Sequence, residues 1–171
     1  SWDINKYPVI VLDADDWHHG VIGIVASRLT EKYARPSILV SFEGNDESND
    51  RSLDVGKGSG RSIKGLNLVD ALCSCSDYLS KFGGHELAAG LSVTRKDLPA
   101  FIEKINRYAI ENLSNEDMTP TVDVDCEIKF SDLTFSLAQQ LQKLEPYGVG
   151  NPMPTFAIRD VTVGEISAIS E

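Results

Sequence analysis

The chain has 171 residues, of which 42% are hydrophobic and 25% are charged, and its formal net charge is −10. This composition predicts a globular protein of one domain, or of one domain and part of a second. No apolar run approaches the roughly 18 residues of a membrane span, and we expect neither a membrane segment nor a signal peptide. The three cysteines lack paired spacing, which suits a reducing compartment and predicts a cytoplasmic location.

The acidic charge is distributed unevenly. Residues 1–112 hold 13 basic and 16 acidic side chains, whereas residues 113–171 hold 3 and 10. The second part, at −7, should therefore repel polyanions, and it lacks the basic groove of a typical single-strand-binding surface. A small basic cleft in the first part remains compatible with these totals, because charge is focused locally in a cleft.

The first 42 residues predict a βαβ unit. Residues 8–13 (PVIVLD) and 37–42 (SILVSF) are short apolar runs typical of buried strands, and residues 20–34 have apolar positions at helical spacing. A right-handed crossover of this length favours parallel pairing. We therefore predict an α/β fold with a mixed, mostly parallel sheet flanked by helices. The polar residues 44–54 that follow indicate an exposed hairpin or a mobile loop.

The middle of the chain predicts further helices and one short strand. Residues 66–79 and 97–113 carry apolar stripes at helical spacing, the second of them continuous. Residues 86–89 (ELAA) favour a short helix that Gly90 would end. Residues 91–94 then predict a short strand.

A polar linker at residues 114–119 divides the chain into a first domain, 1–114, and a second, 115–171. In the second domain, residues 121–130 alternate as a half-exposed strand does, residues 131–145 predict a helix capped by Ser131 and Asp132, and residues 155–163 predict another strand. Residues 146–154 (PYGVGNPMP) form a rigid turn between them. Because the alternation continues to the last residues, we expect a partial α+β domain that is cut short.

Two glycine-dense segments are the candidate binding site. Glycine lets backbone N–H groups approach a ligand, while hydroxyl, guanidinium and imidazole groups donate hydrogen bonds to phosphate oxygens. A Gly-Gly-His turn before a helix would also place the positive end of the helix dipole at the anion. The candidate phosphate-binding residues are Ser59, Gly60, Arg61 and Ser62 in the first segment and Gly83, Gly84 and His85 in the second.

Each segment also has a simpler interpretation. The first could be a flexible turn with a solvated arginine, and it lacks the spacing of a Walker A loop. The second could be a tight turn in which His85 only caps a helix. Residues 15–19 (DDWHH) contain metal-ligand types, but adjacent side chains rarely converge on one ion. We therefore expect His18 to contact substrate or fix its loop, and we predict neither a metal site nor a catalytic set in this chain.

The chain resembles the RecJ family of single-strand-specific 5′→3′ DNA exonucleases in the DHH superfamily. The stretches that carry the resemblance are residues 17–29 (WHHGVIGIVASRL), 59–63 (SGRSI), 82–91 (FGGHELAAGL) and 144–154 (LEPYGVGNPMP). The Gly-Gly-His-x-x-Ala-Ala-Gly motif is shared across DHH phosphodiesterases. The first and last stretches narrow the match to RecJ.

The resemblance implies that residues 1 to about 112 are a DHH-associated domain and that an OB-fold-like domain follows. It also implies a partner domain of the same protein, carrying the Asp-His-His motif and Mn²⁺ or Mg²⁺, which is absent from this sequence. The implied role of this chain is to hold the 5′ end of single-stranded DNA, within a bacterial, cytoplasmic enzyme of DNA repair and recombination. The chain alone would then be inactive.

Two alternatives stay open. One is a DHH-type phosphodiesterase for short oligonucleotides or cyclic dinucleotides, which shares the Gly-Gly-His turn. The other is a non-enzymatic RNA-binding module, like the related domain of alanyl-tRNA synthetase.

Overall fold

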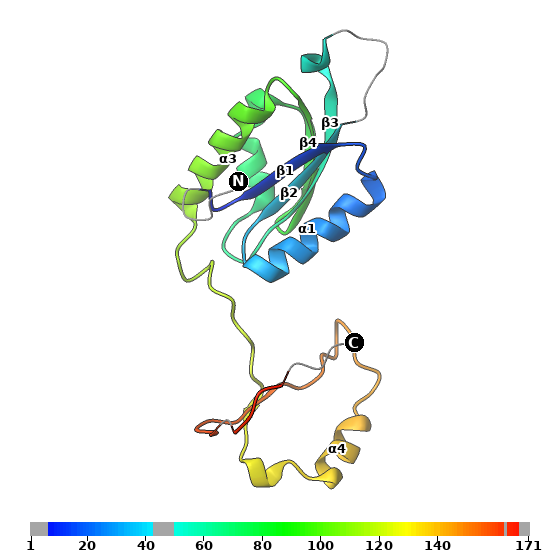
Figure 1. The fold of residues 1–171 in the computed structure, drawn as a ribbon, viewed down its shortest axis with the longest axis vertical. Helices are drawn as coiled ribbons and strands as arrows, with labels where there is room; N and C mark the ends of the chain where they lie inside the picture. Colours follow the sequence, from blue (N-terminus) through cyan, green and yellow to red (C-terminus); the bar gives the residue numbers. More distant parts are fainter. Residues whose placement is uncertain (1–6, 43–49, 163, 168–171) are drawn as a thin grey trace. The chain divides into compact units, whose positions relative to one another are not determined.

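The computed structural model describes residues 7–42, 50–162 and 164–167. The chain divides into two compact units, Ser1–Pro120 and Thr121–Glu171. Figure 1 shows a five-stranded sheet with its helices in the first unit. In the second unit, the described residues form a short α-helix, a 3₁₀ turn and a pair of two-residue strands.

The sheet of the first unit has the strand order β1-β2-β3-β5-β4. Its strands are β1 (Ile10–Asp15), β2 (Ser37–Phe42), β3 (Val55–Arg61), β4 (Leu79–His85) and β5 (Ala88–Thr94). Helix α1 (His19–Tyr33) connects β1 to β2, which pair in parallel. The predicted βαβ unit is thus confirmed.

The prediction of a mostly parallel sheet is wrong. Beyond β1 and β2, the pairs β2–β3, β3–β5 and β5–β4 are all antiparallel. A parallel pair needs a long crossover, whereas antiparallel neighbours can be joined by a tight turn. The class remains mixed α/β, as predicted, and among the described strands of this sheet only β1 and β2 pair in parallel.

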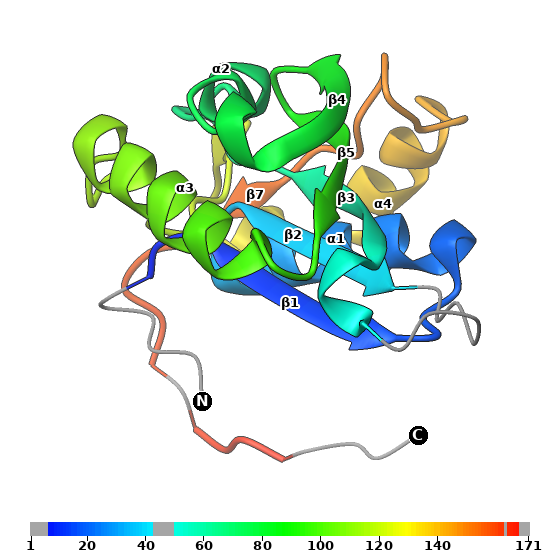
Figure 2. The same cartoon turned by 90° about the horizontal axis from the view of Figure 1, so that it is seen from above.

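Helices cover the two faces of the sheet unequally. Helices α2 (Leu68–Cys73) and α3 (Leu98–Asn112) pack on one face, which carries the main core, whereas α1 lies on the opposite face (Figures 1 and 2). On its own face α1 buries Ile22 and Ala26 against Leu39 of β2. We call the face under α1 the α1 face and the other the core face.

The predicted short helix at residues 86–89 is wrong. Residues 83–85 are the end of β4, Glu86 and Leu87 form a two-residue turn, and β5 begins at Ala88. A Cβ on Gly84 would lie 2.3 Å from the carbonyl oxygen of Ala88, so the missing side chain allows the two strands to pair this closely. Strand pairing therefore outweighs the local helix preference of this segment. The predicted helix at 66–79 is shortened for the same reason: α2 ends at Cys73 and Leu79 begins β4.

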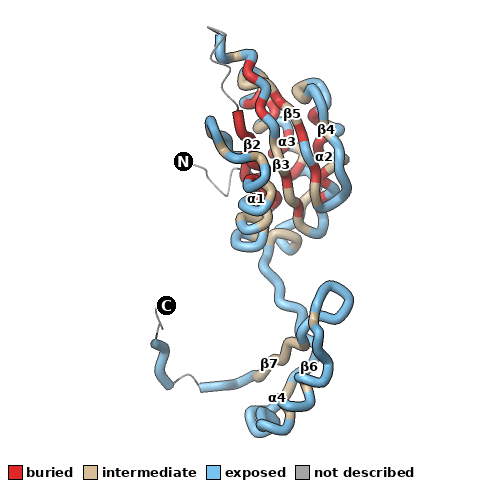
Figure 3. Tube along the Cα trace, turned by 90° about the vertical axis from the view of Figure 1, so that its right-hand side faces the viewer, coloured by how far each residue is buried: buried red, intermediate tan, exposed pale blue. Residues whose placement is uncertain are grey.

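The second unit has little regular structure in its described residues. The predicted strands at 121–130 and 155–163 are reduced to β6 (Cys126–Glu127) and β7 (Phe156–Ala157), which pair in parallel. Helix α4 (Phe135–Gln142) is capped by Thr134, whose hydroxyl accepts from the N–H of Leu137; the predicted caps Ser131 and Asp132 lie in a preceding 3₁₀ turn instead. Figure 3 shows that the buried residues gather in the first unit, and none of the described residues after 120 is buried.

Of the polar segment predicted at 44–54, residues 44–49 lie outside the described residues, and Arg51–Leu53 form a 3₁₀ turn. No helix in the described part of the chain is long and apolar enough to cross a membrane.

The two glycines of the β4–β5 hairpin should respond differently to alanine. Gly84→Ala introduces a Cβ within 2.6 Å of the Ala89 Cα, at a backbone φ of 153°, so we expect a loss of about 2 kcal/mol or more in the free energy of unfolding. Gly83→Ala is the matched control, because its Cβ would have no neighbour within 4 Å. Urea unfolding of both variants measures the difference, and equal losses would contradict the packing role of Gly84.

Candidate functional site

Strand β3 presents two chemically different faces. On the core face it has only glycines: Cβ atoms on Gly56, Gly58 and Gly60 would lie 2.6–3.0 Å from apolar side chains of the main core. Successive residues of a strand point to opposite faces. The alternate residues, Lys57, Ser59 and Arg61, therefore stand on the α1 face.

Gly60, one of the candidate phosphate-binding residues, thus has a packing function. A Cβ there would lie 3.0 Å from Leu68 and 3.2 Å from Ile38. Its carbonyl oxygen accepts a hydrogen bond from the Arg61 guanidinium at 2.8 Å.

The register of the sheet brings the two predicted segments into one group. Arg61 is paired with Ala88, and Ala88 is paired in turn with His85, so these residues form one row across β3, β5 and β4. The next row on the same face is Ser59, Gly90 and Gly83. The middle strand contributes only small residues, which leaves the space above it open between the polar side chains of its neighbours.

Two backbone hydrogen bonds fasten the hairpin turn to the loop after β3. The N–H of Ser62 donates to the carbonyl of Leu87 at 2.9 Å, and the N–H of Leu68 donates to the carbonyl of Glu86 at 2.8 Å. Ser62 is buried, and its hydroxyl donates to the carbonyl of Leu66 at 2.8 Å. Ser62 thus holds the loop together and does not join the group on the α1 face.

The Arg61 guanidinium is held close to its own strand. Its Nη1 donates to Ser59 Oγ at 3.2 Å. Helix α1 passes directly above, since a Cβ on Gly23 would lie 3.0 Å from Ser59 Oγ and 3.1 Å from Arg61 Nη2. The absence of a side chain at Gly23 therefore makes room for the two polar groups between helix and sheet.

The two candidate histidines have different surroundings. His85 is exposed at the end of β4, where its Nδ1 accepts from the N–H of Leu87 at 3.4 Å. His18 is the N-cap of α1, and its Nδ1 accepts from the N–H of Gly20 at 3.1 Å. This hydrogen bond fixes the loop before α1, which is one of the two roles expected for His18. Gly84, the remaining candidate, is exposed and packs closely against Ala88 and Ala89 of β5.

In the segment of residues 15–19, Asp15 forms ion pairs with two arginines. Asp15 accepts hydrogen bonds from Arg51, at 2.9 Å, and from Arg95, and these two guanidinium groups, Arg95 first, lower the pKa of its carboxyl below the ordinary value. Asp54 is buried beside the same two arginines, 3.5 Å from Arg51 and 3.9 Å from Arg95. Within the described residues, no group of three or more His, Cys, Asp or Glu side chains could hold a metal ion.

Three features of this face were not identified from the sequence: Gly23, Lys81 and the small residues of β5. Lys81, Gly83 and His85 alternate along β4 as Lys57, Ser59 and Arg61 do along β3, and this period of two was the available signal. It was missed because residues 86–89 favoured a helix, which would have removed the hairpin. The role of Gly23 could not be recognised from the neighbouring sequence, because it depends on how α1 crosses β3.

Comparison with known proteins assigns both parts of the chain. Residues 6–111 match the DHHA1 domain, and residues 124–171 match the RecJ OB domain. The chain belongs to the RecJ family of DHHA1 proteins. The resemblance seen in the sequence is thereby confirmed.

RecJ relatives match most of this chain. The single-stranded-DNA-specific exonuclease RecJ of Bacillus subtilis is 34% identical over 160 residues, which is 94% of this chain and 20% of that protein. A crystal structure of RecJ from Thermus thermophilus in complex with Mg²⁺ matches with a TM-score of 0.72 and 34% identity, over 88% of this chain and 22% of that one. A second, in complex with Mn²⁺, has the same TM-score over 90% and 21%. The chain thus spans about a fifth of the length of these RecJ proteins.

The described residues of this chain offer no set of ligands for metal ions such as those in the two RecJ structures. Asp15, His18 and Asp54 are committed to arginines or to a helix cap. The described donor set of this chain does not fit a Mg²⁺ or Mn²⁺ site, which needs several convergent oxygen ligands.

The paired carboxylate of Asp15 predicts an acid-sensitive contribution to stability. Its pKa is depressed in the folded state, so the contribution is present above the unfolded-state pKa of about 4 and is lost as the pH falls through the folded-state value. We expect Asp15→Asn to unfold more readily than wild type at pH 7, and the gap to close toward about pH 2. Urea unfolding across this range measures it, with Asp13→Asn as the control for loss of one charge from the same strand. A gap that does not change with pH would contradict the assignment.

Proposed function

We propose that this chain binds the 5′ end of single-stranded DNA within a RecJ-like exonuclease. The observation that carries the proposal is the register row that joins Arg61 and His85 across Ala88, with Ser59 in the next row. The two glycine-dense segments, which the sequence analysis proposed together as the binding site, thus contribute Ser59, Arg61 and His85 to the same face of the sheet.

The chemistry of this face suits a terminal phosphate. An arginine guanidinium offers a planar fork of donors that matches phosphate oxygens, and the Ser59 hydroxyl lies 3.2 Å from it. His85 is exposed and accepts a hydrogen bond through Nδ1 in the hairpin turn, so Nε2 is the ring nitrogen that would bind a phosphate. Ala88, Gly90 and Gly83 place little or no side chain between these groups, so a phosphate can approach the backbone closely.

The proposal assigns positioning to this chain and hydrolysis to another part of the enzyme. RecJ of Thermus thermophilus binds Mg²⁺ and Mn²⁺, and the described residues here offer no such site. Holding the strand end in place contributes to catalysis by orientation. We infer that the chain by itself leaves DNA intact, and that its cellular setting is repair and recombination in a bacterial cytoplasm. We also propose that the first domain ends at residue 114 and the second begins at residue 115, a few residues before the division between the two compact units at Pro120.

The proposed anchor predicts a preference for a 5′-phosphate that depends on Arg61. Wild type should bind a short single-stranded DNA more tightly with a 5′-phosphate than with a 5′-hydroxyl, and Arg61→Ala should remove about 1–3 kcal/mol of that gain. Calorimetry at low salt measures both affinities, and gel analysis of the same samples shows whether the DNA stays intact.

The matched control is Arg107→Ala, because Arg107 is an exposed arginine of α3, on the core-face side. Equal binding of both DNA forms by wild type would overturn the end-anchor proposal. Tighter binding of RNA than of DNA would instead favour an RNA-binding module of the alanyl-tRNA synthetase type.

Replacing Gly23 by alanine should weaken binding without lowering the stability of the fold. In Gly23→Ala the new Cβ lies 3.0–3.1 Å from Ser59 Oγ and Arg61 Nη2, so it displaces the ends of both side chains. We expect a weaker 5′-phosphate preference together with an unchanged or higher free energy of unfolding, since alanine is favoured over glycine in a helix by up to about 1 kcal/mol. Ile24→Ala, at an exposed neighbouring position, is the control. Unchanged binding in Gly23→Ala would show that the spacing between α1 and Arg61 is unimportant.

A further inference from the structure

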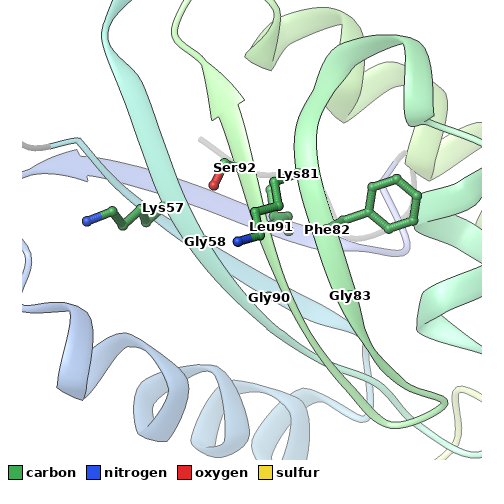
Figure 4. A pocket seen from close by; sticks show the side chains of 8 residues that line it. All are labelled: Lys57, Gly58, Lys81, Phe82, Gly83, Gly90, Leu91 and Ser92. Carbon is green, nitrogen blue, oxygen red and sulfur yellow. The ribbon is translucent and has the colours of Figure 1, made fainter.

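A cavity of about 360 Å³ adjoins the candidate site, between β3 and β4, and shares Gly83 and Gly90 with it. Its floor is Gly83 and Gly90, and its sides include Lys57, Lys81 and Ser92. In Figure 4 the Lys57 and Lys81 side chains extend from separate strands, while Phe82 points away toward the helices.

The register makes this cavity a continuation of the candidate site. Lys57 pairs with Ser92 and Ser92 with Lys81, which gives a third row on the α1 face after those of Arg61 and Ser59. The lysine row lies four residues from the arginine row, about 13 Å along an extended strand. The two outer strands are two strand spacings apart, about 10 Å, which admits one nucleic-acid strand lying along β5.

The charge of this surface is one-sided although the chain is acidic. The sequences of β3, β4 and β5 contain Lys57, Arg61, Lys81 and His85 and no acidic residue. The chain as a whole has a net charge of −10. Two lysines and an arginine beside small residues are complementary to a sugar-phosphate backbone, which carries a negative charge at every step.

We propose that Lys57 and Lys81 bind internucleotide phosphates of the same single strand, downstream of its anchored 5′ end. The strand would enter at the row of Arg61 and His85 and run along β5 toward Ser92. The proposal rests on the proposed function for its polarity. It adds a second contact region that sets how many nucleotides the chain engages.

The test is the dependence of affinity on oligonucleotide length. The probes are 5′-phosphorylated oligothymidylates of two and six nucleotides, and the 171-residue chain is titrated at several salt concentrations. For Lys57→Gln/Lys81→Gln we expect about three- to tenfold weaker binding of the six-nucleotide probe, and little change for the two-nucleotide probe. The slope of log affinity against log salt should fall by about 1.4 in magnitude for the longer probe, as two lost phosphate contacts on a single strand require.

The matched control is Lys104→Gln/Arg107→Gln, which removes the same charge from exposed positions of α3. Lys81→Gln alone should give about half of the slope change, and it covers the case in which the double variant folds poorly. Equal weakening of both probes, or of neither, would overturn the proposal.

The outcome is separable from that of the end anchor. If Arg61→Ala abolishes the 5′-phosphate preference while the lysine variants show no length dependence, the anchor stands and the lysine row is refuted. If the lysine variants shorten the bound length while the 5′-phosphate has no effect, the lysine contacts stand and the end anchor is refuted.

Discussion

The candidate site depends on antiparallel pairing of one strand with two neighbours. Strand β5 lies between β3 and β4, so its register decides which residues of the two glycine-dense segments meet. Arg61 and His85 are far apart along the chain and belong to different strands, yet both pair with Ala88. The hydrogen bonds from Ser62 to Leu87 and from Leu68 to Glu86 hold this arrangement at the hairpin turn. Without that pairing each segment would be an isolated polar loop.

The packing on the two faces of the sheet explains why the site can remain open. On the core face, side chains of neighbouring strands and helices, among them Phe42, Leu91 and Leu68, fill the space above the glycines of β3. On the other face, α1 covers β2 and reaches β3 through Gly23. Away from the site, Arg95 lies 4.0 Å above the ring of Phe42 and also pairs with Asp15. Ion pairs and core packing thus support the strands from outside the site.

The sequence was informative wherever a local pattern determines structure. The apolar runs around Leu39 and the stripe that includes Phe101 and Ile105 correctly indicated β2 and α3. The glycines, Arg61 and His85 were identified as candidates from residue chemistry and from the RecJ motifs.

What could not be predicted depends on how particular backbone and side-chain atoms meet in the folded chain. Helix preference misread residues 86–89, because the decisive contact is between Gly84 and Ala88 across the hairpin. The burial of Ser62 and the helix cap at His18 likewise follow from hydrogen bonds that spacing alone does not reveal. The alternation of Lys81 with Gly83 and His85 could be interpreted only once β4 was known to be a strand.

The alternation of glycine and polar residues along β3 also protects the fold against misalignment. Glycine-rich strands specify their pairing weakly, because few side chains distinguish one alignment from the next. A slip of one residue in β3 would turn Lys57, Ser59 and Arg61 onto the core face, among Phe42, Leu91 and Leu68. Burying an unpaired charge there is far more costly than burying a glycine. The residues proposed to bind DNA therefore also exclude the shifted alignment, so ligand recognition and the fidelity of strand pairing depend on the same three side chains.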